Sequence, residues 1–532
     1  MQGAAVETRL TLSKILGPAG PGISLAMQAG LRFLDKHGTS SLLKQAGRTV
    51  MQVPSFEAID KTALQDSYGG NQKGASDDFL VGRGLFYLTE QRRLFLDCTS
   101  GHYQMLWGYN HPVLCAAIEA ASRAGVIWDN HSNLPQAPLK RLAHRLVELG
   151  NTPGEKDPLD TVLLGTCTGS VACAAALKIQ LKVFERQHGK TIAPAIVVLD
   201  GNYHGTDMVP QHMRGMWPEL MNCLKVIVLQ PNDPEALEKA FRKHGSHIAG
   251  FWAEPIMMNR EAIAVDVGYL RLAQKWCRKT GALMCIDEIQ TGFWQPEIFE
   301  YRRMDLQPDL VVLGKGMTAG FHPLSGVLMR SRHDVLQQYD AISTNGSAAM
   351  PAFVSLCSLE MILEQGERIR EVGCRIHQGF EALAAEFPEV LASPQGRAHL
   401  TGLKFRDVER AKQFQKRLLE AGLWTRVHAY HEGHSTILTK LGLLADQTIV
   451  DFVLNSLRKL LRQDQAHSSG NKRGDHERIR TTQSGPAGHD TGTVRVPGPG
   501  PARIPRCVGA PRRAAGAASA RRRAVRRSGL PA

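Results

Sequence analysis

The chain of 532 residues contains 43% hydrophobic and 21% charged residues, the composition of an ordinary folded protein. Its net charge of +14 comes mostly from residues 466–532, which hold 14 of the 64 lysines and arginines but only three of the 50 acidic residues. Residues 1–465 are therefore nearly neutral, which argues against nucleic acid as a partner, and no apolar run reaches the 18 residues or so that a membrane-spanning helix needs.

No secretory signal is recognisable in residues 1–90, a segment that we expect to pack on a smaller C-terminal domain. The ten cysteines are scattered along the chain without a Cys-x-x-Cys pair. This spacing predicts free thiols in a reducing compartment rather than a disulfide framework or a zinc site. The protein is therefore expected to be cytoplasmic.

Strands and helices alternate in residues 91–340, the predicted large domain. Short apolar runs predict strands at 93–98, 161–164, 195–199, 225–229, 247–253, 283–286 and 310–313. The main predicted helices are 113–124, 137–149, 170–186, 234–243 and 268–279. This alternation indicates an α/β fold with a mostly parallel sheet covered on both faces, and such sheets bind ligands at the carboxyl ends of their strands.

The pattern changes twice after residue 340. Residues 341–465 contain longer helices and a few weak strands, which predicts a small α+β domain. Residues 466–532 are rich in Gly, Pro, Ala and Arg and have no apolar periodicity, which predicts disorder. This tail is either a basic arm for RNA or an acidic partner, or an extension without function, and we favour the second interpretation.

Lys315 stands between the apolar runs 310–313 and 324–329 and is flanked by Gly314 and Gly316. The glycines allow a sharp turn and the close approach of a ligand. A lysine at a strand end beside buried apolar surface loses hydration, which lowers its pKa and frees the amine for Schiff-base chemistry. An isolated Gly-Lys-Gly is more often a solvated turn, so the interpretation depends on the other residues at this edge.

Two further groups lie at the ends of other predicted strands, and each is suited to bind a charged part of a ligand. Gly169 and Ser170 open a long helix, where unpaired N–H groups and the helix dipole favour a phosphate. Asp287 ends an apolar strand, where a carboxylate needs a cationic partner such as a protonated pyridine. The plainer alternatives are a helix N-cap turn for the first group and, for the second, a capping Asp287 beside a solvated Glu288.

Two further residues are predicted at the same edge of the sheet. Tyr203 follows the strand 195–199 and offers a flat aromatic ring, although a single tyrosine there is also explained by packing. Glu254 closes the strand 247–253, and the proline after it holds it in an extended conformation. Independent coincidence is a poor explanation for five such positions at successive strand ends.

These motifs, in this order and spacing, resemble those of class III aminotransferases, which are pyridoxal-phosphate enzymes of fold type I. The similarity covers about residues 84–461. The motifs that carry it are Gly169-Ser170, Tyr203-His204-Gly205, Glu254-Pro255, Asp287-Glu288-Ile289-Gln290-Thr291-Gly292, Gly314-Lys315-Gly316 and Thr344. The resemblance implies an enzyme that moves an amino group from an amine or amino acid donor to a keto or aldehyde acceptor.

The resemblance also implies a role for each site residue. Lys315 would hold pyridoxal 5′-phosphate as a Schiff base and move the substrate proton, Asp287 would pair with the pyridine nitrogen, and Tyr203 would stack on the ring; these three form the expected catalytic group. The other expected cofactor contacts are Ile289 behind the ring, Gln290 at the ring hydroxyl, Gly169 and Ser170 at the phosphate, Glu254 nearby, and Thr344 from the second subunit of a homodimer.

Some positions depart from the family pattern. Cys173 lies in the helix after Ser170 where the family usually has Asn or Val, and Trp294-Gln295 replaces a usual Gly-Arg. The arginine that many members use for a substrate α-carboxylate has no counterpart in residues 436–444, where Lys440 is the only cation. An ordinary α-amino acid donor is therefore not required by the sequence.

The sequence leaves several alternatives. A pocket of His102, Tyr103 and Trp107 suggests an amine or a larger apolar substrate. Related enzymes carry out aminomutation, racemisation, decarboxylation or phospho-lyase elimination with the same residues. A last alternative is a non-catalytic scaffold that acts through the basic tail, and the intact cofactor motifs argue against it. Finally, the histidines at 428, 431 and 434 are interpreted as a polar loop, so no metal site is predicted.

Overall fold

The protein is described from a computed structural model. The structure describes residues 10–61, 63, 78–129, 133–216, 224–427 and 434–480, with side chains as far as residue 465. The chain forms two compact units, Met1–Ser468 and Ser469–Ala532, and of the second unit only the helical residues 469–480 are described. Within these residues, each helix is too short or too polar to cross a membrane.

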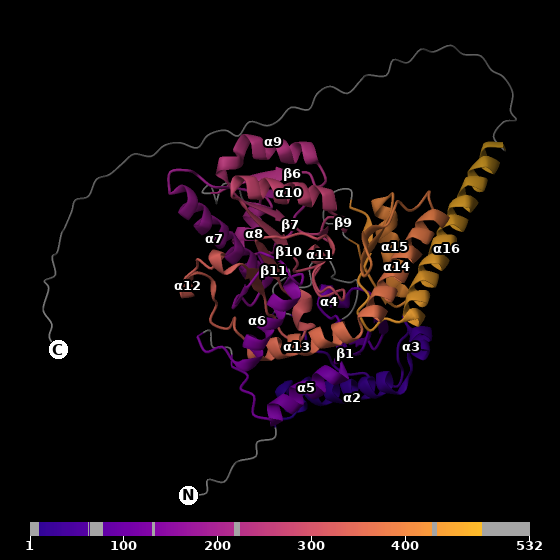
Figure 1. The fold of residues 1–532 in the computed structure, drawn as a ribbon. Coiled ribbons are helices and arrows are strands. Elements are labelled where there is room, and N and C mark those ends of the chain that lie inside the picture. The colour runs from indigo at the N-terminus through magenta and orange to yellow at the C-terminus, as the bar shows by residue number, and fades with distance from the viewer. Residues whose placement is uncertain are drawn as a thin grey trace, which may run out of the picture. The chain divides into compact units, whose positions relative to one another are not determined.

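A seven-stranded sheet forms the centre of the first unit (Figure 1). Its spatial order is β4-β12-β11-β10-β7-β5-β6, and β12 alone in this sheet runs antiparallel to its neighbours. The bounds are β4 Thr161–Leu164, β5 Ala195–Leu199, β6 Lys225–Leu229, β7 Ile248–Ala253, β10 Leu283–Asp287, β11 Leu310–Leu313 and β12 Gly326–Met329. The predicted α/β fold with a mostly parallel sheet is confirmed.

Helices cover both faces of this sheet because successive strand residues point to opposite sides. Val197 and Ile286 belong to a hydrophobic cluster with residues of α6, α9 and α10, whereas Val198 and Cys285 belong to a cluster with residues of α7. The helices in and around this part are α5 Pro112–Arg123, α6 Ala137–Gly150, α7 Gly169–His188, α8 Met208–Met213, α9 Pro234–His244, α10 Val267–Thr280, α11 Glu300–Arg303, α12 Gln338–Ala341 and α13 Ala349–Glu364.

A third cluster joins the N-terminal helices α2 and α3 to α14, α15 and α16. It also includes residues of two four-stranded sheets, of order β1-β2-β3-β15 and β13-β14-β17-β16. The remaining bounds are α1 Leu12–Ile15, α2 Gly20–Lys36, α3 Thr39–Gln45, β1 Phe79–Arg83, β2 Phe86–Thr89, β3 Leu94–Asp97, α4 Ser100–Tyr103, β8 Ile256–Met257, β9 Ile263–Ala264, α14 Gly366–Glu386, β13 Gln395–Arg397, β14 Leu400–Lys404, α15 Val408–Glu420, β15 Leu423–Trp424, β16 Arg426–Val427, β17 Thr436–Thr439 and α16 Gln447–Arg480.

The packing differs from the expected segment boundaries at three points. Strand β3 pairs in parallel with β15, so it belongs with the C-terminal part of the protein, which comprises α14 to α16 and the strands between them, and not with the central sheet. Helix α13 lies within the expected C-terminal domain of residues 341–465 but packs against α5 and α6. Helix α16 continues to Arg480, whereas the sequence predicts disorder from residue 466; residues 481–532 lie outside the described part.

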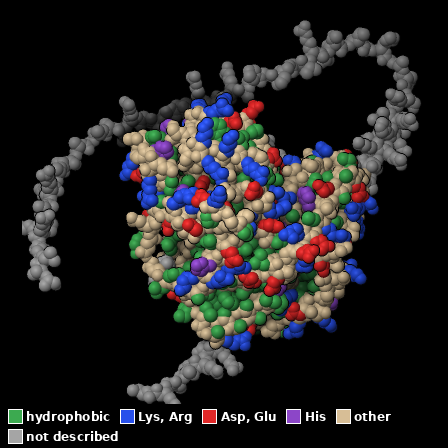
Figure 2. All heavy atoms as spheres, viewed as in Figure 1, with side chains coloured by type: hydrophobic (Ala, Val, Ile, Leu, Met, Phe, Trp, Pro, Cys, Tyr) green, Lys and Arg blue, Asp and Glu red, His purple; other side chains and the backbone are tan. Residues whose placement is uncertain are grey.

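Basic and acidic side chains are intermixed on the face shown in Figure 2, as expected from the nearly neutral composition of residues 1–465. The eight cysteines among the described residues are free thiols, and four of them are buried. Cys98, Cys173, Cys277 and Cys285 thus behave as small core residues.

Candidate active site

The predicted site residues meet at the carboxyl edge of the central sheet. Asp287 is the last residue of β10, Lys315 lies two residues beyond β11, and Glu254 directly follows β7. Tyr203 lies four residues beyond β5. Because β11, β10, β7 and β5 are consecutive parallel neighbours, their carboxyl ends bring these four side chains to one place.

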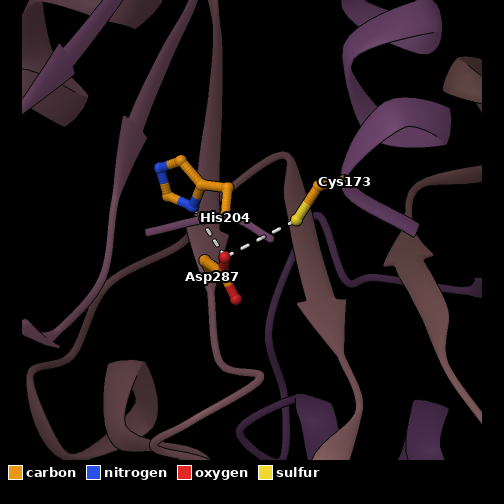
Figure 3. A group of neighbouring side chains, drawn as sticks. All are labelled: Cys173, His204 and Asp287. Atoms are coloured by element: carbon orange, nitrogen blue, oxygen red, sulfur yellow. Dashed lines mark hydrogen bonds and ion pairs between the residues drawn. The ribbon is translucent and has the colours of Figure 1, made fainter. Parts of the chain in front are cut away.

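Asp287 is held by two side chains that lie beside it in Figure 3. Its Oδ2 atom accepts a hydrogen bond from His204 Nδ1 at 2.7 Å and lies 3.6 Å from the thiol of Cys173. Its Oδ1 atom accepts from the Ile289 backbone N–H at 2.9 Å. In this buried group of three, the Cys173 sulfur, a ring nitrogen of His204 and a carboxylate oxygen of Asp287 all lie within 4.8 Å of one another. The hydrogen bonds account for this spacing. The contacts fix the carboxylate at the end of β10.

Lys315 begins a short 3-10 turn, Lys315–Thr318, with a left-handed φ of +40°. Its ammonium nitrogen lies 5.8 Å from the centroid of the Tyr203 ring. Burial lowers the pKa of Lys315 and the charge of Arg426 lowers it further, while Asp287 and Glu254 oppose the shift. A larger share of the amine is therefore neutral and nucleophilic than in an exposed lysine.

Glu254 and Gln290 form a second polar pair at this edge. Glu254 Oε1 accepts from the Tyr203 backbone N–H at 2.8 Å, and Gln290 Nε2 lies 3.4 Å from Glu254 Oε2. Burial raises the pKa of Glu254 to about 7, and the nearby Asp287 adds to the shift. Gln290 Oε1 is buried and has no partner among the described residues, so it can accept a hydrogen bond from a ligand.

The start of α7 forms a narrow cradle. Ser170 Oγ accepts from the Thr206 backbone N–H at 3.1 Å, and a Cβ atom on Gly205 would lie 2.1 Å from that hydroxyl. A Cβ atom on Gly169 would likewise lie 2.7 Å from Ile289. Only glycines allow these approaches, and they leave the helix N-terminus open to an anion.

Thr344 is the predicted site residue that the structure does not bring into this group. It is exposed, and within the described part of the chain its hydroxyl makes no hydrogen bond to the other site residues. The neighbouring Ser343 donates its backbone N–H to Gly165 O at 2.9 Å, next to the cradle. Of the three histidines considered as a polar loop, His428 and His431 lie outside the described residues.

The family model of aminotransferase class-III matches residues 79–459, which is most of the chain. The chain belongs to the class III aminotransferase family. It is 28% identical to an acetylornithine aminotransferase of Xylella fastidiosa over 333 residues, which cover 60% of this aminotransferase and 77% of that protein. It is also 28% identical to an ornithine aminotransferase of Emericella nidulans over 325 residues, which cover 57% of this chain and 69% of the relative.

A solved structure supports the same fold. The transaminase of the marine bacterium Virgibacillus has a TM-score of 0.65 to the aminotransferase, at 20% identity, and the match covers 75% of this chain and 96% of the other. Enzymes of this family act with pyridoxal 5′-phosphate, which is therefore the cofactor of this aminotransferase. The residues fit it, because the site combines a buried lysine, a fixed carboxylate, an unpartnered amide oxygen and an open cradle.

The structure adds residues to the site that the sequence did not assign. His204 was visible only as the neighbour of Tyr203, and Cys173 only as a departure from the family pattern. Arg426, on β16, donates from Nη1 to His102 Nδ1 at 2.9 Å, and no local motif marks it. Lys440 is fully buried next to the aminotransferase site and donates to the Gln290 backbone oxygen at 2.9 Å.

The predicted substrate pocket of His102, Tyr103 and Trp107 is wrong for one of its three residues. Trp107 is completely buried and donates from Nε1 to Ser358 Oγ at 2.9 Å, so it belongs to the core of the aminotransferase. The alternative interpretation of Glu288 as a solvated residue is also wrong, because this side chain has no exposed surface.

Proposed function

We propose that this aminotransferase takes the amino group from a donor that carries a carboxylate and passes it to a keto or aldehyde acceptor, with Lys315 as the residue that holds the cofactor. The observation that carries the proposal is the pattern of charge around Lys315. Asp287 and Glu254 act on it from the cofactor edge of the sheet, whereas Arg426 adds positive charge from the C-terminal part. Such a site accepts a cofactor on one side and an anionic substrate group on the other.

Arg426 is our candidate for the carboxylate-binding residue. Its guanidinium donates to His102 Nδ1 at 2.9 Å, beside Tyr103 in the turn 100–103, and its positive charge contributes to the lowered pKa of Lys315. A guanidinium binds a carboxylate through two parallel hydrogen bonds. This argues against the larger apolar donor that the sequence suggested. The named relatives support the proposal, because ornithine and acetylornithine are both carboxylate-bearing amines.

The proposed roles of the other residues follow from their contacts. When bound, pyridoxal 5′-phosphate supplies an electron-withdrawing ring that spreads the charge left on the substrate carbon after deprotonation. Asp287, held by His204, would keep a proton at the ring nitrogen, and Lys315 Nζ would take the proton from the substrate carbon and return it during transfer. Gln290 would accept from the ring hydroxyl, Ile289 would back the ring, Tyr203 would pack on it and Glu254 would lie nearby.

The phosphate would be held at the cradle by Gly169 and Ser170. We place Thr344 of a second subunit beside them, which requires a homodimer, and its exposure supports this arrangement. The free thiols of the described cysteines support a reducing compartment such as the cytoplasm. Light scattering of the purified protein tests the dimer, and a monomeric mass for the active species would contradict it.

The main experiment is a panel of donors added singly to the holoenzyme while the visible spectrum of the cofactor is followed. An amino donor alone must convert the cofactor to its aminated form, which distinguishes transamination from racemisation, decarboxylation, aminomutation or elimination. We expect conversion with amines that carry a carboxylate and about 100-fold less with matched amines that lack it, a loss of roughly 3 kcal/mol.

Arg426→Met provides the matched control. It should remove the preference for the carboxylate by raising KM for those donors at least ten-fold, while the matched amines react as they do with the parent enzyme. Equal rates for both donor classes in the parent would contradict the carboxylate proposal, and the absence of any conversion by a donor alone would contradict transamination.

A further inference from the structure

Lys440 is a buried lysine that has no paired carboxylate in the described part of the chain. Its side chain has no exposed surface, and among the described residues it forms no ion pair. Instead Nζ donates to the Gln290 backbone oxygen at 2.9 Å and lies 3.8 Å from the ring centroid of Tyr103 and 5.4 Å from that of Trp294. Lys440, the only cation in residues 436–444, therefore lies near Trp294, which departs from the family sequence.

The backbone of Lys440 contacts a second part of the site. Its N–H donates to Cys98 O at 2.7 Å, and its carbonyl accepts from the Ser100 hydroxyl. Ser100 opens a turn in which four successive residues, 100–103, have positive φ values of 48°, 53°, 62° and 75°. Left-handed backbone is costly for residues other than glycine, so neighbouring contacts must hold this turn in place.

We propose that Lys440 is a positioning residue that fixes the main chain at Gln290 and the turn of Tyr103 relative to the cofactor. The proposal rests on the function given above, in which Gln290 contacts the ring of the cofactor. Lys440 thus links two segments at the site. Its side chain binds the Gln290 backbone, and its own backbone binds Ser100 in the turn 100–103. Tyr103 covers the lysine, so the amine acts through Gln290 and does not touch the substrate.

The chemistry of Lys440 separates this role from ordinary stabilisation. Burial, with the charge of Lys315, lowers the pKa of Lys440 well below its usual range, while Glu254 opposes the shift. A buried amine is costly to the fold, and an apolar side chain of the same length removes this cost, which offsets the loss of the one hydrogen bond to the Gln290 carbonyl. Lys440→Met should therefore keep or raise stability while it loosens the site.

The test compares holoenzymes loaded with pyridoxal 5′-phosphate. For Lys440→Met we expect a visible circular dichroism band of the cofactor reduced by about half and cofactor dissociation about ten-fold faster, with a melting temperature of the apoprotein equal to or above that of the parent. Lys404→Met is the matched control. Lys404 lies on the neighbouring strand β14 and pairs with Glu261 at 2.7 Å, so its loss should lower the melting temperature and leave the cofactor signals unchanged.

A parent-like dichroism band and dissociation rate in Lys440→Met would overturn the proposal, as would a loss of both only in proportion to a lower melting temperature. If that variant does not fold, Ser100→Ala decides, because it removes only the hydroxyl that binds the Lys440 carbonyl. It should show the same changes to a smaller degree, and parent-like signals would again overturn the proposal. A failure of the proposed function would give a different result, because the visible dichroism band of the parent holoenzyme would then persist in Lys315→Ala.

Discussion

The adjacent residues Asp287 and Glu288 have different roles because their carboxyl groups have different surroundings. Asp287 lies against His204 and Cys173 and is available to the cofactor. Glu288 points into the core, where Oε1 accepts from the Tyr301 backbone N–H at 2.8 Å and Oε2 accepts from the hydroxyl of Thr291. Burial, which these hydrogen bonds only partly offset, raises the pKa of Glu288 to about 8. This carboxyl group is therefore protonated at neutral pH.

Glu288→Gln tests this assignment through the pH dependence of stability. In the parent, the unfolded chain releases the Glu288 proton near pH 4.5 and the folded chain near pH 8, so this group makes the parent lose stability as the pH rises between those values. The variant lacks the titration. We expect the stability of Glu288→Gln relative to the parent to rise by roughly 4 kcal/mol from pH 4.5 to pH 8. Urea unfolding at several pH values measures it, and a constant difference would contradict the assignment.

At the scale of elements, the phosphate cradle depends on how closely the loop after β5 approaches the first turn of α7. Gly205 has a φ of +123° and lies against Ser170, with no room for a Cβ atom. The N-terminus of a helix attracts an anion only if nothing else fills the space in front of it. The cradle is therefore sensitive to a single methyl group at this position.

Gly205→Ala should weaken binding of pyridoxal 5′-phosphate at least ten-fold, because the methyl group must displace the Ser170 hydroxyl. The matched control is Gly189→Ala at the other end of α7. Gly189 also has a positive φ, +71°, with a ψ of −167°, but a Cβ atom there would meet no other atom within 4 Å, so the change should cost roughly 1–3 kcal/mol of stability through backbone strain and leave cofactor affinity unchanged. Titration of both apoproteins with the cofactor compares them, and equal affinities would show that the cradle is elsewhere.

In the whole molecule, side-chain packing of α16 is described as far as Gln465. Among the described side chains, Leu461 is the last buried one along the chain, and Gln465 still contacts Glu389. A chain of residues 1–465 should therefore fold, bind the cofactor and retain the donor-dependent spectral change to within about two-fold, since no described core contact is lost. Spectra and melting curves of this truncated chain provide the measurement. Loss of cofactor binding would mean that the tail contributes to the site.

Local patterns in the sequence were sufficient for the central sheet. The apolar runs that form β4, β5, β6 and β11 have the predicted bounds, because the short strands of this sheet consist mostly of apolar and β-branched residues, including the partly exposed edge strands β4 and β6. The residues at their carboxyl ends followed from the same pattern, which is why Asp287, Glu254, Tyr203 and Lys315 were found together.

Other features depend on contacts between residues far apart in the chain. Strand β3 pairs with β15 across more than three hundred residues, and no local signal announces that pairing. Arg426 and Lys440 reach the site from the C-terminal part, and the depth of Trp107 depends on its hydrogen bond to Ser358. These positions become interpretable only once the tertiary packing is known.

Borohydride reduction followed by peptide mapping shows which amine holds the cofactor. Reduction fixes the cofactor permanently on the amine to which it is bonded. We expect the peptide containing Lys315 to carry the added mass and Lys315→Ala protein to carry none, and we expect this variant to lose activity by about 1,000-fold or more. A label on another lysine, Lys440 included, or an unlabelled parent enzyme would contradict the proposed role of Lys315.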